Sequence, residues 1–227
     1  MVFVKAPYPG QVKTRLGQSV GDRQAAQLYR CFTEDVLDTV ESLEADCLIC
    51  FAPAAEVSFL KAWLGNHRSY LAQSGIDLGE RMATAFRHSF RVGYEQVLIV
   101  GSDSPDLPRT YLTQAFDALQ QEQAVIGPSE DGGYYTLGFT PSNFCPEVFG
   151  PLPWSTPQVY PQTLSILKNA GASVHILPPW PDIDTLEDLR QYFLRHQAQD
   201  INQIQTSRSL ASRSLTYLQD HAKNLSI

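Results

Sequence analysis

The chain has 227 residues, of which 43% are hydrophobic and 18% are charged. This length accommodates one ordinary domain with a full hydrophobic core, and this composition excludes disordered, fibrous and low-complexity proteins. The 17 lysines and arginines are outnumbered by 24 aspartates and glutamates, and the resulting net charge of −7 argues against nucleic acid or an anionic membrane as a partner.

Strand and helix patterns alternate along the first half of the chain. Continuous apolar runs predict short strands over residues 2–5 and 46–52. Apolar residues at helical spacing predict helices over residues 21–43, about 55–64 and 78–92. Strands that alternate with helices are typical of α/β proteins.

The second half continues this alternation. Residues 96–100 are apolar on both faces, which is typical of a buried parallel strand. The remaining predicted elements are a helix over 108–121, strands over 124–127 and 134–139, a helix ending at 169, a strand over 173–177 and a helix over 186–196. The pattern predicts a three-layer α/β/α sandwich around a mostly parallel sheet, in one domain over residues 1–197. The tail over residues 198–227 is polar and is compatible with a loosely attached helix.

The sequence carries no signal for membrane insertion or for cysteine chemistry. No apolar run reaches the length of a membrane span and no signal segment opens the chain, so we expect a cytoplasmic protein. Cys47 and Cys50 form a C-x-x-C pattern, but they fall in a predicted strand, where residues three apart point to opposite faces. With Cys31 and Cys145, they are expected to be buried, reduced thiols.

The first of four polar clusters follows the strand over 2–5 and contains Lys5, Gly10, Lys13 and Arg15. Ligands of open α/β sheets bind outside the carboxyl ends of the strands, where we expect all four clusters to meet. The loop lacks the first glycine of a P-loop, but the charged groups of Lys13 and Arg15 could neutralise phosphate oxygens. A solvated basic turn is the alternative explanation.

Two further clusters supply carboxylates. Asp103 follows the buried strand in the segment Gly-Ser-Asp-Ser-Pro-Asp, and Asp184 follows the last predicted strand. Hard oxygen ligands of this kind bind Mg²⁺ or Mn²⁺, and a pair of carboxylates beside substrate phosphates is a usual magnesium site. Helix capping is the alternative in both places: Asp103, Ser104 or Asp106 before one helix, and Asp184 or Thr185 before the other.

The fourth cluster and one further segment each have a structural and a functional explanation. Asp131, Gly132, Gly133 and Tyr134 connect two predicted strands and carry the Asp-Gly signal of a hairpin turn. The glycines would also let backbone amides approach a ligand, with polar side chains beside them. Asp77 precedes a predicted helix whose first amides could bind a base or an anion, although capping by its carboxylate is an equal alternative.

These residues, in this order, resemble the GT-A superfamily of nucleotide-diphospho-sugar transferases, and specifically the DUF2064 group of bacterial glycosyltransferases. The resemblance extends from Phe3 to about Tyr192. Guanylyltransferases of coenzyme F420 and molybdenum-cofactor synthesis share the Asp-x-Pro element and the Asp-Gly-Gly turn. The common D-x-D motif is absent from the first acidic site. The matching segments are Lys5 to Leu16, Asp77 to Arg81, Gly101 to Leu107, Gly127 to Tyr135, Trp154 to Thr156 and Asp182 to Asp188.

The resemblance implies a Rossmann-like three-layer sandwich of the GT-A type with a mixed, mostly parallel sheet. It also implies a nucleotide in the amino-terminal half and an acceptor in the carboxyl-terminal half. The implied nucleotide-binding residues are Lys5, Gly10, Lys13, Arg15, Asp77, Gly79 and Arg81. Asp103 and Asp184 would hold Mg²⁺ or Mn²⁺. The implied acceptor residues are Gly132, Gly133, Tyr134 and Trp154, and the implied catalytic residues are Lys13, Arg15, Asp103 and Asp131.

We therefore expect a metal-dependent transferase, and specifically a glycosyltransferase that moves a sugar from a nucleotide-sugar to a small acceptor. A nucleotidyltransferase that joins a nucleoside triphosphate to a phosphorylated acceptor and releases pyrophosphate is the alternative, because Lys13 and Arg15 would suit a triphosphate. A non-catalytic nucleotide-binding protein of the same fold would bind without turnover. The donor base, the donor sugar, the acceptor and the oligomeric state have no signal in the sequence.

Overall fold

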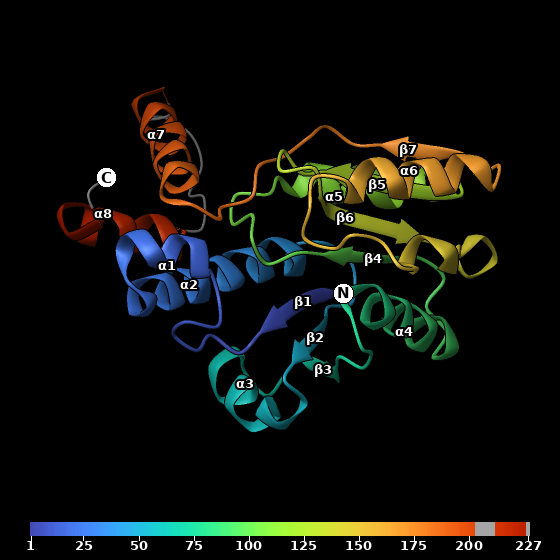
Figure 1. The fold of residues 1–227 in the computed structure, drawn as a ribbon, viewed down its shortest axis with the longest axis horizontal. Coiled ribbons are helices and arrows are strands. Elements are labelled where there is room, and N and C mark those ends of the chain that lie inside the picture. Colours follow the sequence, from blue (N-terminus) through green and yellow to red (C-terminus); the bar gives the residue numbers. More distant parts are fainter. Residues whose placement is uncertain (203–211, 226–227) are drawn as a thin grey trace. The chain divides into compact units, whose positions relative to one another are not determined.

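The computed structural model describes residues 1–202 and 212–225, and Figure 1 shows their helices and strands. The chain divides into two compact units. The first comprises Met1–Ala6, Thr39–Gly101 and Leu107–Pro181, and the second comprises Pro7–Asp38, Ser102–Asp106 and the described residues from Asp182 onward. Of the predicted tail, residues 203–211 and 226–227 lie outside the described residues, and the single domain over 1–197 stays a prediction.

The first unit contains a seven-stranded sheet with the strand order β3-β2-β1-β4-β6-β5-β7. β6 runs antiparallel to β4 and β5, and the other neighbouring strands pair in parallel. This mixed, mostly parallel sheet confirms the predicted fold class. The strands are β1 (Val2–Lys5), β2 (Leu48–Ala52), β3 (Ser69–Ala72), β4 (Val97–Val100), β5 (Ala124–Pro128), β6 (Tyr134–Phe139) and β7 (Val174–Ile176).

The helices are distributed over both units. The first unit contains α3 (Val57–Leu64), α4 (Leu78–Arg91), α5 (Arg109–Ala118) and α6 (Val159–Asn169), with the short 3₁₀ helices η1 (Ala54–Glu56), η2 (Pro141–Asn143) and η3 (Pro146–Phe149). The second unit contains α1 (Thr14–Val20), most of α2 (Asp22–Glu41), α7 (Leu186–Asn202) and α8 (Arg213–Leu225). None of the helices in the described part of the chain is both long and apolar enough to cross a membrane.

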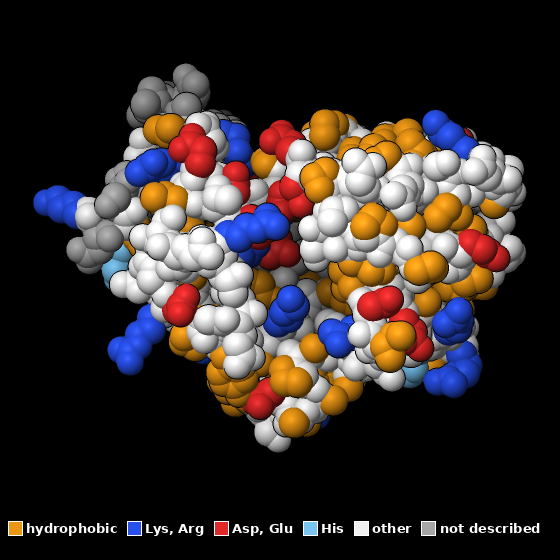
Figure 2. All heavy atoms as spheres, viewed as in Figure 1, with side chains coloured by type: hydrophobic (Ala, Val, Ile, Leu, Met, Phe, Trp, Pro, Cys, Tyr) orange, Lys and Arg blue, Asp and Glu red, His pale blue; other side chains and the backbone are white. Residues whose placement is uncertain are grey.

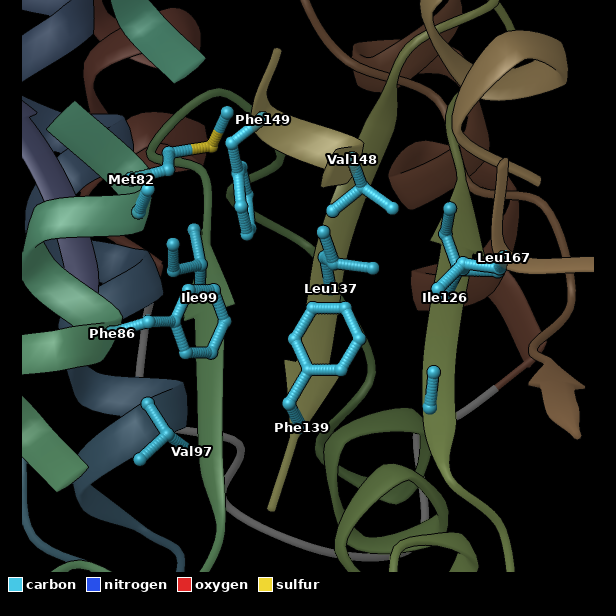
Figure 3. Close-up of a cluster of buried hydrophobic side chains, with 12 residues drawn as sticks. Met82, Phe86, Val97, Ile99, Ile126, Leu137, Phe139, Val148, Phe149 and Leu167 are labelled. Carbon is cyan, nitrogen blue, oxygen red and sulfur yellow. The ribbon is translucent and has the colours of Figure 1, made fainter. Parts of the chain in front are cut away.

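One face of the sheet carries the main core of the first unit. Side chains of alternate strand residues point to the same face, and Figure 3 shows Ile99, Leu137 and Ile126 beside one another on β4, β6 and β5. Phe86 of α4 and Leu167 of α6 cover them, and both are fully buried. Burial of an aliphatic or aromatic side chain of this size contributes about 1.5–3 kcal/mol, so this core fixes α4 against the sheet.

The second unit has a separate helical core. Leu16 of α1, Phe32 of α2, Tyr192 of α7 and Leu218 of α8 are all fully buried in it. The rings of Phe32 and Tyr192 meet edge to face with 6.4 Å between their centroids. This core therefore holds α1 and α7, the two helices that begin beside Lys13 and Asp184.

The sheet topology contains a switch point between β1 and β4. β1 pairs with β2 on one side and with β4 on the other, so the strand order reverses there. The cluster with Lys13 follows β1, and Asp103 follows β4. Among the strands and α-helices of the described residues, β3 and α1 were not predicted from the sequence.

The cysteines differ in part from the prediction. All four are free thiols, and Cys31 and Cys50 are buried. Cys47 and Cys145 are only half-buried, so the prediction of four buried thiols was wrong for these two. Burial raises the pKa of Cys31 to about 11 and the pKa of Cys50 to about 12, which leaves both thiols protonated and unreactive at neutral pH.

Candidate functional site

Lys13, Asp103 and Asp184 come together within the second unit. Nζ of Lys13 lies 2.5 Å from Oδ1 of Asp103 and 2.8 Å from Oδ1 of Asp184. Nη1 of Arg15 lies 3.4 Å from the other carboxylate oxygen of Asp184. Two carboxylates from distant parts of the sequence thus contact one cationic group, and this group is the lysine ammonium.

Lys13 is held in an unusual conformation. It is the residue that precedes α1, and its backbone is left-handed, with φ of 46° and ψ of 46°. A non-glycine residue adopts this region at a cost of roughly 1–3 kcal/mol, so other contacts must favour it. Burial alone would lower the pKa of Lys13, but the carboxylates of Asp103 and Asp184 raise it above the ordinary value of a lysine. Lys13 therefore stays charged at neutral pH although only 3% of its side chain is exposed.

The start of α7 positions the Asp184 carboxylate. Oδ2 of Asp188 accepts hydrogen bonds from the backbone amides of Asp184 at 3.0 Å and Thr185 at 2.7 Å. The hydroxyl of Thr185 in turn accepts from the amide of Asp188 at 3.2 Å. This reciprocal arrangement is a capping box, with Thr185 as the capping residue. Capping therefore does not use the side chain of Asp184, which is left to contact Lys13.

The loop after β4 positions Asp103. Its carbonyl oxygen accepts a hydrogen bond from the amide of Ile183 at 3.0 Å, which joins the two acidic segments directly. Three residues later, Oδ2 of Asp106 accepts from Arg195 at 3.0 Å and contacts Nε2 of His196 at 3.1 Å. Burial alone would raise the pKa of Asp106, but hydrogen bonds and the positive charge of these α7 partners lower it.

These contacts correct the predicted cap of α5. That helix begins after Pro108 without any side-chain cap. Asp106 contacts α7 instead, and the interpretation of Asp106 as the cap was wrong. Neither Arg195 nor His196 was identified from the sequence, because nothing in the local pattern of a helix indicates a partner about 90 residues earlier.

The two carboxylates fit a divalent cation of the Mg²⁺ type. Among the described residues, no group of three or more Asp, Glu, His or Cys side chains is arranged to hold a metal. Mg²⁺ needs fewer protein ligands, since it is usually bound by one or two carboxylates together with waters and substrate phosphates. The ammonium of Lys13 is a monovalent cation in the place where the divalent cation would bind. Its contacts show that oxygens of Asp103 and Asp184 can reach the same cation. Their side chains are 46% and 36% exposed, so a ligand can approach them.

In the first unit, the residues at the start of α4 form structural contacts. Oδ1 of Asp77 accepts the amide of Glu80 at 2.8 Å, and the Glu80 carboxylate accepts the amide of Ile76 at 2.8 Å. Asp77 is therefore the cap of α4. Nε of Arg81 donates to the carbonyl oxygen of Gly75 at 3.1 Å and fastens the preceding loop to the helix.

Gly79 and Trp154, predicted in two different binding sites, contact each other. A Cβ atom on Gly79 would lie 2.5 Å from Cζ2 of Trp154 and 2.5 Å from the carbonyl oxygen of Phe149. The glycine therefore permits close packing of the indole on α4. The indole Nε1 of Trp154 is buried, and no described residue accepts its hydrogen bond.

The Asp-Gly-Gly segment forms the predicted hairpin turn between β5 and β6. Oδ1 of Asp131 accepts from the amide of Gly133 at 2.8 Å and from the hydroxyl of Ser129 at 2.5 Å. Gly132 has φ of +89°, and a Cβ atom there would lie 2.4 Å from the carbonyl oxygen of Pro157. The hydroxyl of Tyr134 lies 3.7 Å from Sδ of Met82, so the ring points toward α4.

The candidate residues are therefore divided between the two units. Lys5 is the exposed last residue of β1, and Gly10 has φ of +75° in the turn before Lys13. The second unit brings together Lys13, Arg15, Asp103 and Asp184 and also contains Gly10. The first unit contains Lys5, Asp77, Gly79, Arg81, Asp131, Gly132, Gly133, Tyr134 and Trp154.

Comparison with known proteins supports the fold and places the chain in a family. Residues 36–156 match the family model described as "Uncharacterized protein conserved in bacteria (DUF2064)". None of the curated proteins matches the sequence. A crystal structure from Desulfovibrio desulfuricans G20, named provisionally as a nucleotide-diphospho-sugar transferase, is 39% identical. The similarity covers 99% of this chain and 95% of that chain, with a TM-score of 0.90.

Two more distant structures share the fold. CMP:2-keto-3-deoxy-manno-octonic acid synthetase complexed with CTP is 11% identical, with a TM-score of 0.56 over 88% of this chain and 97% of that chain. 4-Diphosphocytidyl-2C-methyl-D-erythritol synthase of Anaerococcus prevotii DSM 20548 is 12% identical, with a TM-score of 0.55 over 86% and 97%. The match to the family model and the 39% identity over nearly the whole chain show that this protein belongs to the DUF2064 family.

Proposed function

We propose that this protein is a transferase that uses a nucleotide with a divalent cation, and that it moves a sugar from a nucleotide-sugar to a small acceptor. The observation that carries this proposal is the convergence of the Asp103 and Asp184 carboxylates on one cationic position. The likeness to the Desulfovibrio protein and to the fold of two nucleotide-using synthases supports a transferase. The provisional name of the Desulfovibrio structure, a nucleotide-diphospho-sugar transferase, supports the choice of a sugar donor in this proposal.

Asp103 and Asp184 would hold Mg²⁺ or Mn²⁺. Such a cation offsets the negative charge of the donor phosphates and of the phosphate leaving group. Because both carboxylates contact the Lys13 ammonium, a divalent cation can take this position only if Lys13 withdraws. The released ammonium would then be available to phosphate oxygens, together with the guanidinium of Arg15, which is 62% exposed.

The acceptor side of the proposal rests on residues of the first unit. Trp154 has a buried indole N–H without an acceptor among the described residues, and an oxygen of the bound acceptor would satisfy it. Asp131 is exposed, and its Oδ1 is used by its own turn, so Oδ2 is the oxygen left to bind an acceptor hydroxyl. Tyr134 would contribute the side of its ring, since its hydroxyl lies against Met82.

A second candidate function is nucleotidyl transfer, in which the α-phosphorus of a nucleoside triphosphate is attacked and pyrophosphate leaves. The observation in its favour is the position of Arg15, the second residue of α1, whose guanidinium lies beside the Asp184 carboxylate that also contacts Lys13. Two cationic side chains and a divalent cation together suit the charge of a triphosphate.

The test is a reaction screen with nucleotide-sugars and nucleoside triphosphates, with Mg²⁺ or Mn²⁺ and a set of small acceptors. Release of a nucleoside diphosphate indicates glycosyl transfer, and release of pyrophosphate indicates nucleotidyl transfer. Asp184→Asn is the variant that tests the role of the carboxylate, because it keeps the shape of the side chain and removes its charge. We expect this variant to lose about 100-fold or more of the turnover, the scale of a lost transition-state contact.

Three results would contradict the proposal. If neither product forms and no nucleotide raises the melting temperature, nucleotide-dependent transfer is wrong. If a nucleotide raises the melting temperature without turnover, and equally in Asp103→Asn, the protein is a non-catalytic nucleotide-binding protein. If Asp184→Asn releases product as fast as the original chain, the carboxylate pair does not hold the cation.

A further inference from the structure

A cavity of about 390 Å³ lies beside β3 and α4. The described residues that line it all belong to the first unit. Cavities of about 300–1,000 Å³ are typical of sites for small molecules. β3 is at the edge of the sheet, so the cavity opens beside an outermost strand rather than at the β1/β4 switch point. None of its lining residues belongs to the Lys13, Asp103 and Asp184 cluster.

The polar lining of this cavity is strongly cationic. Arg81, Arg87, His88 and Arg91 of α4 all line it, and no acidic side chain is among the described residues that do so. Arg81, His88 and Arg91 recur at spacings of seven and three residues, which places them on one side of the helix. In Figure 2, blue and pale-blue side chains lie over the region of α4 together with red acidic side chains, but no acidic residue is among the described residues that line the cavity. The chain as a whole has a net charge of −7, so this concentration of positive charge runs against its composition.

The three arginines are not used by ion pairs within the described structure. Arg81 donates to a carbonyl oxygen, Arg87 lies 5.9 Å from the centroid of the Phe144 ring, and Arg91 contacts Nδ1 of His88 at 3.3 Å. By contrast, Arg68, Arg195 and Arg213 of this chain each pair with a carboxylate. Guanidinium groups that line a cavity without an acidic partner are available to bind an anionic group of a ligand.

The other lining residues indicate the chemistry of the ligand. Gln73, Ser74 and Thr84 add neutral polar groups, and Cys50, Leu71 and Ala85 add an apolar surface. A guanidinium matches two oxygens of a phosphate group, and the apolar surface suits a carbon skeleton. We propose that this cavity, the β3–α4 groove, binds a small molecule that carries a phosphate group.

This site goes beyond the proposed transfer reaction. Of the nucleotide-binding residues that the family resemblance implies, only Arg81 lines this groove. Arg87 and Arg91 have no role in that reaction, and both are exposed. They can therefore be changed without altering the proposed donor and acceptor residues.

Phenyl phosphate is a suitable probe, because it combines one phosphate group with a small apolar ring. Binding is measured by isothermal titration calorimetry at low ionic strength with EDTA, so that no divalent cation is present at Asp103 and Asp184. We expect the double variant Arg87→Gln/Arg91→Gln to bind at least about tenfold more weakly than the original chain, because two charge-assisted contacts are lost. The double variant Arg109→Gln/Arg190→Gln removes the same charge elsewhere and should bind as the original chain does.

Chemical-shift changes at Gln73, Thr84 and His88 on addition of phenyl phosphate would place the ligand in the groove. The inference is wrong if the original chain does not bind, if both double variants bind equally well, or if the shifts fall elsewhere. It is also wrong if Arg87→Gln/Arg91→Gln lowers the melting temperature but leaves phenyl phosphate binding unchanged. The arginines would then stabilise the carboxyl end of α4 instead of binding a ligand. Asp184→Asn separates the two proposals: it should lose turnover and keep phenyl phosphate binding.

Discussion

The candidate aspartates of the two units differ in what their side-chain oxygens bind. In the first unit, Asp77 and Asp131 accept hydrogen bonds from amides within four residues of themselves, and they stabilise a helix start and a hairpin turn. In the second unit, Asp103 and Asp184 lie 81 positions apart and both contact the ammonium of Lys13. Asp103, Asp131 and Asp184 follow predicted strands, and Asp77 lies in a similar polar segment before a predicted helix. A cluster of this kind therefore indicates chemistry only where its carboxylates are not used by the nearby backbone.

The contact between Gly79 and Trp154 gives the largest expected effect on stability. Replacing glycine by alanine inside a helix usually stabilises it by up to about 1 kcal/mol. At Gly79, however, the new Cβ would lie 2.5 Å from both the Trp154 ring and a backbone oxygen. We expect Gly79→Ala to lower the free energy of unfolding by about 3 kcal/mol, measured by urea denaturation. An unchanged or increased stability would show that Gly79 is not required by this packing.

Asp106 tests whether the second unit depends on its long-range charge contacts. Asp106→Asn should lower the free energy of unfolding at neutral pH by about 2 kcal/mol, because a buried carboxylate loses its charge-assisted contacts with Arg195 and His196. The exposed Asp220→Asn is the matched control and should change stability by less than about 0.5 kcal/mol.

The pH dependence of this variant has a definite sign. The pKa of Asp106 is lowered in the folded protein, so its contribution is present above the ordinary aspartate pKa of about 4 and is lost as the pH falls through the lower folded value. The unfolding free energies of Asp106→Asn and the original chain should therefore converge in acid. A constant difference from neutral pH down to strongly acidic pH would contradict the ionised state of Asp106.

Asp77 gives the smallest expected effect and sharpens the contrast between the two kinds of carboxylate. Asp77→Ala should cost about 1 kcal/mol of stability through loss of the α4 cap, whereas Asp77→Ser keeps a capping oxygen and should cost much less. Thermal denaturation measures both. If Asp77→Ser is as unstable as Asp77→Ala, the carboxylate does more than cap the helix.

Much of the fold could be predicted because the strands in the middle of the sheet are strongly apolar. The strand over Tyr134–Phe139 was predicted with its observed bounds, and β4 begins one residue later than predicted. β3 was missed because it is an edge strand with mixed polarity, and Ser69 and Ala72 are exposed. α1 was missed because it follows a loop rich in proline and glycine and has no side-chain cap.

The candidate site could be predicted only in part. Its acidic residues follow strands, and the general behaviour of parallel sheets brings such positions together. The position of the Lys13 ammonium depends on the left-handed backbone of Lys13. A lysine in a sequence gives no sign of that conformation. The partners of Asp106 lie on a helix about 90 residues away and depend on how α7 packs, which the local sequence pattern does not contain.

The most direct test of the central claim is a Mn²⁺ titration of the original chain, Asp184→Asn and Lys13→Met, followed by electron paramagnetic resonance. If Asp103 and Asp184 hold one divalent cation in place of the Lys13 ammonium, the original chain should bind one Mn²⁺. Asp184→Asn should bind it at least about tenfold more weakly, and Lys13→Met should bind it more tightly, because no ammonium competes for the carboxylates. Equal Mn²⁺ affinity in the original chain and Asp184→Asn, or weaker binding in Lys13→Met, would contradict this account.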